Sequence, residues 1–160
     1  MVDEHSPAAT PDQTVRHGRV IWASHPPHGV ARVTVESHAF HAMPVSIQEG
    51  DPVPNESTPG ELLAVVHAMF MAWTLAERLA TDGTPASELV VFAECSFQGP
   101  ASGRHLVGVD LTVHGNVPGL DPGAFSDRAE QARRTYLHAS GARDDIPGNL
   151  DAVLTESHDG

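Results

Sequence analysis

Cysteine is nearly absent from this chain, since Cys95 is the single cysteine among 160 residues. One thiol excludes an internal disulfide, a zinc site built from cysteines and a redox cycle between two cysteines of the same chain. In the segment ELVVFAECSFQ, alternation places Cys95 on one apolar face together with Leu89, Val91, Ala93 and Phe97. We therefore predict a buried, inert thiol with a raised pKa.

Positive charge is also scarce, because 9 basic residues face 21 acidic ones and the net charge is -12. No cluster of lysine or arginine is present, and the ARR triplet at 132–134 is interpreted as a pair on a helix surface. Phosphate binding needs a positive stripe. We therefore expect neither nucleic acid nor a membrane as a partner.

Long hydrophobic runs and export signals are missing as well. The longest apolar run lies within 62–75, is interrupted by His67, and is judged too short to span a bilayer. The first residues, MVDEHSPAATPDQ, show neither a basic n-region nor an apolar h-region, so a cytoplasmic protein is expected. No nucleophile elbow, phosphate-binding glycine loop or His-Glu-x-x-His motif occurs, so we expect no cofactor and no metal.

The chain does contain a series of well-marked strands. Alternating β-branched residues predict strands in 19–25 and 31–37, and a third strand is predicted within 39–50. Segments 88–98 and 104–117 predict two further strands, which we expect to pair antiparallel.

A long central helix is predicted to start at Pro59. Thr58 as N-cap, Pro59 at the first helical position and Glu61 three residues after the cap are typical of a capping box, and Gly83 ends the helix. The helix is apolar on nearly every side, and such a helix must be covered all round. One sheet covers one face only, so the second helix or a partner chain must cover the rest. We therefore expect a homodimer.

A second helix is predicted from Pro122, with Asp121 as its N-cap, to about Ala139. Helical spacing places four of its residues on one face, namely Phe125, Ala129, Ala132 and Tyr136. Tyr136 is therefore expected to point inward. A short final strand is predicted in 151–157.

These elements predict an α+β fold in the order β-β-β-α-β-β-α-β, with antiparallel sheets and two long helices, the central one buried. We expect one domain at 15–154, a disordered tail at 1–14 and a loose tail at 155–160.

The sequence resembles the OsmC/Ohr family of hydroperoxide-reducing proteins. TPGELLAVVHAMFMAWTLAERL is similar to that family's Pro-Glu-(Glu/Gln)-Leu start of a central apolar helix, and His67-Ala68 matches its OsmC branch. VHGNVPGLDPGAF resembles the family's strand and turn before the second helix, and GRVIW fits the opening strand. The resemblance covers roughly residues 18–154. It implies an intertwined homodimer with two active sites at the subunit interface.

The resemblance also implies a peroxidatic cysteine on the central helix, a resolving cysteine on the second helix, and an arginine and a glutamate that orient the first thiolate. This sequence departs at all four positions. The first cysteine falls at Phe70, or at Met69 with a one-residue slip, and the second falls at about Tyr136. Gly60 replaces the glutamate, and 46–55 holds no arginine. We therefore expect the thiol peroxidase activity to be lost.

The substituted pocket at the dimer interface is expected to take an apolar or aromatic small molecule. His67 and Tyr136 are the candidate catalytic base and acid, with Glu61 in support, for a cofactor-independent isomerisation, cyclisation or elimination. The candidate ligand-binding residues are Met69, Phe70, Trp73, His41 and His138.

Plainer interpretations stay open for each catalytic candidate. His67 can be a core histidine, Tyr136 a core residue with its hydroxyl at the edge, and Glu61 a helix cap. The protein would then be a non-catalytic binder or a structural dimer.

Two further alternatives concern other residues. A residual organic hydroperoxide reductase would have to use Cys95. A metal-dependent enzyme would need His38 and His41 on a helical turn, because residues three apart on a strand point to opposite faces.

Overall fold

The computed structural model describes residues 14–22, 30–46, 53–100, 103–139 and 145–155. They belong to two compact units, one on each side of the bond between Pro59 and Gly60. Within the described ranges the elements follow the predicted order β-β-β-α-β-β-α-β. Of the two predicted tails, only residues 14 and 155 lie within these ranges. The end of the predicted first strand, 23–25, lies outside them.

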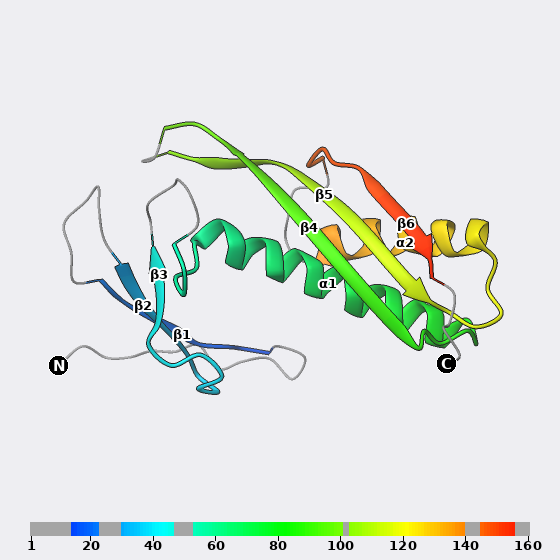
Figure 1. Ribbon diagram of the computed structural model, residues 1–160, viewed down its shortest axis with the longest axis horizontal. Helices are drawn as coiled ribbons and strands as arrows, with labels where there is room; N and C mark the ends of the chain where they lie inside the picture. Colours follow the sequence, from blue (N-terminus) through cyan, green and yellow to red (C-terminus); the bar gives the residue numbers. More distant parts are fainter. Residues whose placement is uncertain (1–13, 23–29, 47–52, 101–102, 140–144, 156–160) are drawn as a thin grey trace. The chain divides into compact units, whose positions relative to one another are not determined.

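The first unit contains a three-stranded antiparallel sheet (Figure 1). β1 (Gly18–Trp22) pairs with β2 (Val30–Val35), and β2 pairs with β3 (Met43–Ser46). The third strand lies within the predicted segment 39–50 and is entered through a turn after β2, in which His38 and Ala42 adopt positive φ angles of 60° and 52°.

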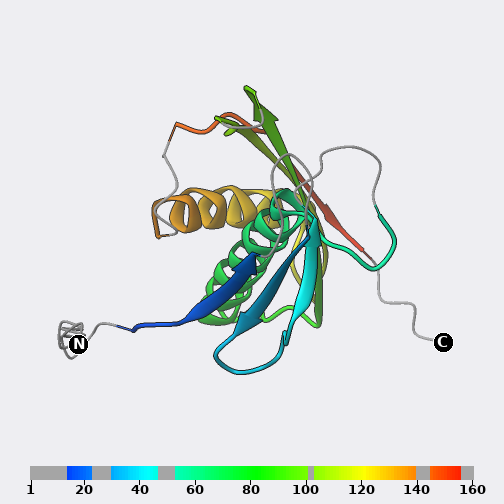
Figure 2. The same cartoon turned by 90° about the vertical axis from the view of Figure 1, so that its left-hand side faces the viewer.

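The second unit places two helices on one face of a three-stranded sheet (Figure 2). β4 (Glu88–Gln98) and β5 (His105–Asn116) pair antiparallel, as predicted. β6 (Leu150–Leu154) runs parallel to β5, so the sheet is mixed and the prediction of antiparallel sheets is wrong here. The physical reason is the crossover through α2 (Pro122–Ala139), which returns the chain to the end of the sheet where β5 began.

The core of the second unit lies between this sheet and the helices. The four residues predicted to share one face of α2 are all buried, which confirms that prediction. They pack with residues from α1 (Pro59–Thr81) and β5, namely Met71, Leu75, Leu79, Val109, Leu111 and Val113. The ring of Phe125 occupies the space beside Gly115, where a side chain on β5 would stand.

Among the described residues of the second unit, helix α1 is covered on one side only. Its buried residues recur every four positions, at His67, Met71, Leu75 and Leu79. The opposite side exposes four apolar residues, Val65, Val66, Met69 and Trp73, which we call the open face of α1. The sheet and α2 both reach α1 from the same side, so the sequence-based expectation that a partner chain covers the other side stays a prediction.

Helix α1 is also long and apolar enough to cross a membrane, with 23 residues and a window of mean hydropathy 1.4. The inference that the apolar stretch is too short is therefore wrong, because the helix extends well beyond residues 62–75. Its buried residues nevertheless form a common core with β5 and α2. On this side α1 is the core helix of the second unit.

Candidate functional site

Two residues that the sequence singles out meet in the core of the second unit. His67 comes from α1 and Tyr136 from α2, and their ring centroids lie 5.9 Å apart with the planes inclined by 72°. His67 is 5% exposed and Tyr136 is 1% exposed. Helix packing thus brings the candidate base and the candidate acid into edge-to-face contact, while their catalytic roles stay predictions.

Each of these side chains carries a buried polar atom that lacks a hydrogen-bond partner among the described residues. These atoms are Nδ1 of His67 and the hydroxyl oxygen of Tyr136. A buried polar group left unpaired costs roughly 1–3 kcal/mol, so such groups are rare in folded proteins. Neither atom is accessible to solvent in this structure, so a ligand would reach the pair only after a local opening of the core.

Burial favours the neutral form of both side chains. Desolvation lowers the pKa of His67 from its ordinary value of 6.5, and desolvation raises the pKa of Tyr136 to about 12. The positive charge of Arg133 partly opposes the rise in the Tyr136 pKa, and a thiolate at Cys95 would add to it. At neutral pH the pair is therefore a neutral imidazole beside a neutral phenol, one able to accept and the other to donate a hydrogen bond.

The lowered pKa of His67 predicts a pH dependence of folding. The unfolded chain binds a proton at His67 more readily than the folded chain does. The folded state therefore has its full stability, as far as His67 is concerned, above a pH of about 6.5, and it loses stability as the pH falls toward the folded-state pKa. We expect the free energy of unfolding to fall between about pH 7 and pH 5, and to fall less in His67→Gln.

Urea titrations across this range measure the effect. His105→Gln, at an exposed histidine at the start of β5, is the matched control and should keep the wild-type dependence on pH. A His67→Gln variant with the full wild-type dependence would show that another group is responsible.

Cys95 lies on the predicted face of β4, whose partly buried residues alternate with exposed ones. The thiol is partly buried rather than fully buried, and it packs against the core of the second unit. Desolvation raises the pKa of Cys95 above its ordinary value of 9.0, so the thiol form dominates at neutral pH. A peroxidatic cysteine needs the opposite shift, toward the thiolate.

The other predicted residues of α1 do not gather around His67. Phe70 is partly buried and packs against the core. Met69 and Trp73 belong to the open face of α1, on the side of the helix opposite His67. Glu61 is exposed in the first turn, six residues before His67. The structure thus joins His67 to Tyr136 and places Glu61, Met69 and Trp73 away from this pair.

The two predicted ligand-binding histidines lie in different units. His138 lines a cleft beside α2. His41 belongs to the first unit and stacks on His38, with ring centroids 5.4 Å apart. The two rings face each other because the segment is a turn and not a strand. In the part of the chain that the structure describes, no group of three or more His, Cys, Asp or Glu residues is arranged to hold a metal ion.

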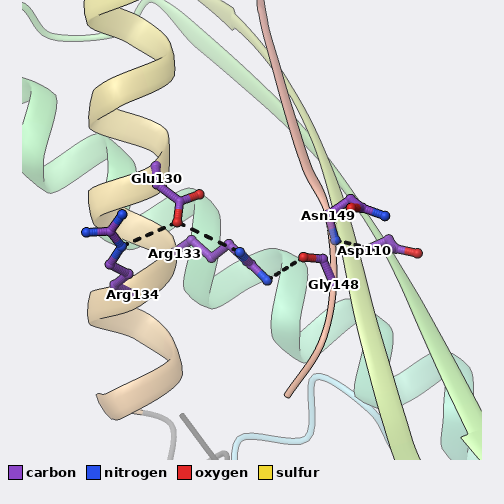
Figure 3. A network of polar contacts seen from close by, with 6 residues as sticks. All are labelled: Asp110, Glu130, Arg133, Arg134, Gly148 and Asn149. Carbon is purple, nitrogen blue, oxygen red and sulfur yellow. Dashed lines mark hydrogen bonds and ion pairs between the residues drawn. The ribbon is translucent and has the colours of Figure 1, made fainter. Parts of the chain in front are cut away.

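Arg133 is not the surface residue that the sequence predicts in the ARR triplet. Arg134 is 75% exposed, as expected, but the Arg133 side chain is only 17% exposed. Its Nη2 atom donates a hydrogen bond of 2.7 Å to the carbonyl oxygen of Gly148, which joins α2 to the segment before β6 (Figure 3). The signal was present in the sequence, because Arg133 directly follows Ala132 on the buried face of α2.

Several solved structures share this fold. An OsmC-like protein of unknown function from Vibrio cholerae matches with a TM-score of 0.69 at 10% identity, over 88% of this chain and 100% of that chain. An OsmC-like protein from Mycoplasma pneumoniae matches with a TM-score of 0.64 at 9% identity, over 91% and 99%. A putative organic hydroperoxide resistance protein from Vibrio cholerae, with captopril in one of its active sites, matches with a TM-score of 0.61 at 17% identity. The match covers 89% of this chain and 95% of that chain.

These matches confirm the OsmC-like α+β fold that the sequence predicts. At such identities the likeness establishes the fold and not the activity. No protein-family model matches the sequence, and no curated protein is similar to it.

Proposed function

We propose that this chain, which has the OsmC-like fold, is a homodimeric protein that binds a small, largely apolar molecule and is not a thiol peroxidase. The buried pair of His67 and Tyr136, each with an unpartnered polar atom, carries the proposal. A neutral imidazole acceptor and a neutral phenol donor can together orient one polar group of an otherwise apolar ligand.

The pKa shifts support binding more than proton transfer. General acids and bases work best when their pKa lies near the working pH. The pKa of Tyr136 is instead raised to about 12, and that of His67 is lowered. Acid–base isomerisation, cyclisation or elimination is the second candidate, and the direct contact between a potential base and a potential acid is the observation that favours it.

The properties of Cys95 do not support the thiol chemistry of the OsmC/Ohr family, which the sequence resembles. The single thiol has a raised pKa, because it is desolvated, and it has no second cysteine in the chain with which to form a disulfide. Phe70 and Tyr136, which replace the two cysteines by the resemblance, carry no sulfur. The absence of a cysteine from both helices supports a role other than thiol chemistry for this part of the core.

The open face of α1 supports the proposed homodimer. An exposed stripe of apolar side chains on one helix marks an interaction surface in a soluble protein. The predicted ligand-binding residues Met69 and Trp73 both lie on this stripe. In a dimer formed through the open face they would lie at the interface, on the side of α1 opposite the pair of His67 and Tyr136.

Tyr136→Phe tests the proposal, because it removes the hydroxyl and keeps the ring. Without a ligand, removal of an unpaired buried hydroxyl is expected to raise the free energy of unfolding by about 1 kcal/mol. The variant is expected to lose the molecule that the wild-type protein retains. Native mass spectrometry of protein purified from its own host measures retention, and urea unfolding measures stability.

Thr135→Ala is the matched control, because it removes an exposed hydroxyl from the neighbouring position of α2. It should retain the ligand. A destabilised Tyr136→Phe variant that still carries the ligand would mean that the hydroxyl has a structural role, and the proposal would fail. Recovery of the retained molecule as two isomers would instead favour the acid–base reaction.

A further inference from the structure

We propose that the second unit binds a small amphipathic carboxylate in a cleft of its own along the C-terminal half of α2. The cleft has a volume of about 520 Å³, within the range of small-molecule sites. Its lining residues are Glu130, Arg133, Arg134, Leu137, His138 and Ile146. Neither His67 nor Tyr136 lines it, so this inference does not depend on the function proposed above.

The cleft carries an excess of positive charge in a strongly acidic protein. The chain has no lysine, and all 9 of its basic residues are arginines. Two of them, Arg133 and Arg134, stand side by side in this lining. Glu130 is shared between them, with Oε1 at 3.3 Å from Nε of Arg134 and 3.8 Å from Nη1 of Arg133. One carboxylate balances one guanidinium, so one positive charge is left for a ligand that carries one negative charge.

Arg133 is held in place and yet incompletely paired. The hydrogen bond from its Nη2 atom to Gly148 fixes the guanidinium, and its side chain is mostly buried. Its Nε atom is buried without a hydrogen-bond partner among the described residues. The separation between Nη1 and Glu130 is too long for a hydrogen bond. The Nη1 group of this rigid guanidinium, together with the exposed guanidinium of Arg134, suits a carboxylate as ligand.

The opposite part of the lining is apolar. Leu137 is 7% exposed and belongs to the core, and Ile146 packs partly against that core. A hydrocarbon segment could therefore contact Leu137 and Ile146 while its carboxylate contacts the two arginines. This combination of one charged end and one apolar wall selects an amphipathic anion over a fully polar one.

The overall charge of -12 does not prevent this binding. At physiological ionic strength the Debye length is about 8 Å, so distant acidic residues are largely screened, whereas the guanidiniums act at contact distance. The same argument predicts that added salt weakens the binding, because Arg134 is mostly exposed.

Isothermal titration of the full chain with octanoate tests the inference. Arg134→Gln removes an exposed charge from the lining and is expected to weaken octanoate binding by at least about fivefold. Arg128→Gln is the matched control, because Arg128 lies on the same helix but pairs with Asp82 and does not line the cleft. The control is expected to bind octanoate as the wild-type protein does.

Two further titrants separate the headgroup from the chain. 1-Octanol has the same hydrocarbon without the charge, and inorganic phosphate has the charge without the hydrocarbon. Weak binding of both, with octanoate binding that depends on Arg134, supports the inference. It is overturned if octanoate does not bind, if 1-octanol binds equally well, if phosphate binds more tightly than octanoate, or if Arg128→Gln and Arg134→Gln weaken octanoate binding equally.

Discussion

The Trp73→Asp variant is expected to be monomeric at concentrations at which the wild-type protein is a homodimer. Trp73 is 63% exposed on the open face of α1, and large aromatic residues are frequent energetic centres of interfaces. The substitution removes this anchor and places an unpaired carboxylate in a surface that must be desolvated. We expect the free energy of association to become at least about 3 kcal/mol less favourable, which is a more than hundredfold increase in the Kd of the dimer. Sedimentation velocity measures it.

Phe92→Asp is the matched control for this variant. Phe92 is 60% exposed on β4, on the face of the sheet that points away from the helices, where its ring contacts His114 edge-on. The control should remain dimeric, because it changes an equally exposed aromatic residue on another surface. If Phe92→Asp dissociates the dimer and Trp73→Asp does not, the interface is the outer face of the sheet. A wild-type protein that is monomeric at every concentration would refute the homodimer.

Gly148→Ala is expected to destabilise the second unit by roughly 3–5 kcal/mol, enough to unfold a marginally stable domain. A Cβ atom at this position would collide with the carbonyl oxygen of Val109 and lie 2.6 Å from its carbonyl carbon. Both are backbone atoms of β5, so no change of side-chain rotamer can relieve the contact. Thermal and urea unfolding followed by circular dichroism measure the loss.

The segment around Gly148 cannot move away without breaking other bonds. Val109 donates its N–H to the carbonyl oxygen of Pro147 at 2.9 Å. Asn149 donates its N–H to the carboxylate of Asp110 at 2.6 Å (Figure 3). The carbonyl of Gly148 accepts the hydrogen bond from Arg133. A shift would therefore also release the arginine that anchors the proposed carboxylate cleft.

Gly103→Ala is the control for the glycine prediction. Among the described residues, a Cβ atom there would meet only Pro100, at an ordinary distance of 3.9 Å. The control is expected to change the free energy of unfolding by less than about 0.5 kcal/mol. A Gly148→Ala variant as stable as this control would show that the segment before β6 does not lie against β5.

Local sequence patterns determined the order and the boundaries of the main elements. Asp121 caps α2 as predicted, since its carboxylate accepts the N–H of Ala124 at 3.0 Å. Gly83, with a φ of 81°, ends α1 where the sequence places the stop. The buried face of α2 also follows its helical spacing. These features depend on residues within a few positions of one another, so the sequence alone suffices to predict them.

The tertiary structure alone decided features that depend on distant segments. The parallel pairing of β6 with β5 follows from the crossover through α2, and the one-sided burial of α1 follows from which elements reach it. The contact between His67 and Tyr136 was foreseeable, but the unpaired state of their polar atoms was not. The hydrogen-bond partner of Arg133 is Gly148, which lies 15 residues away. Residue type and spacing do not encode such partners, because packing against remote backbone determines which polar groups are paired and which remain available to a ligand.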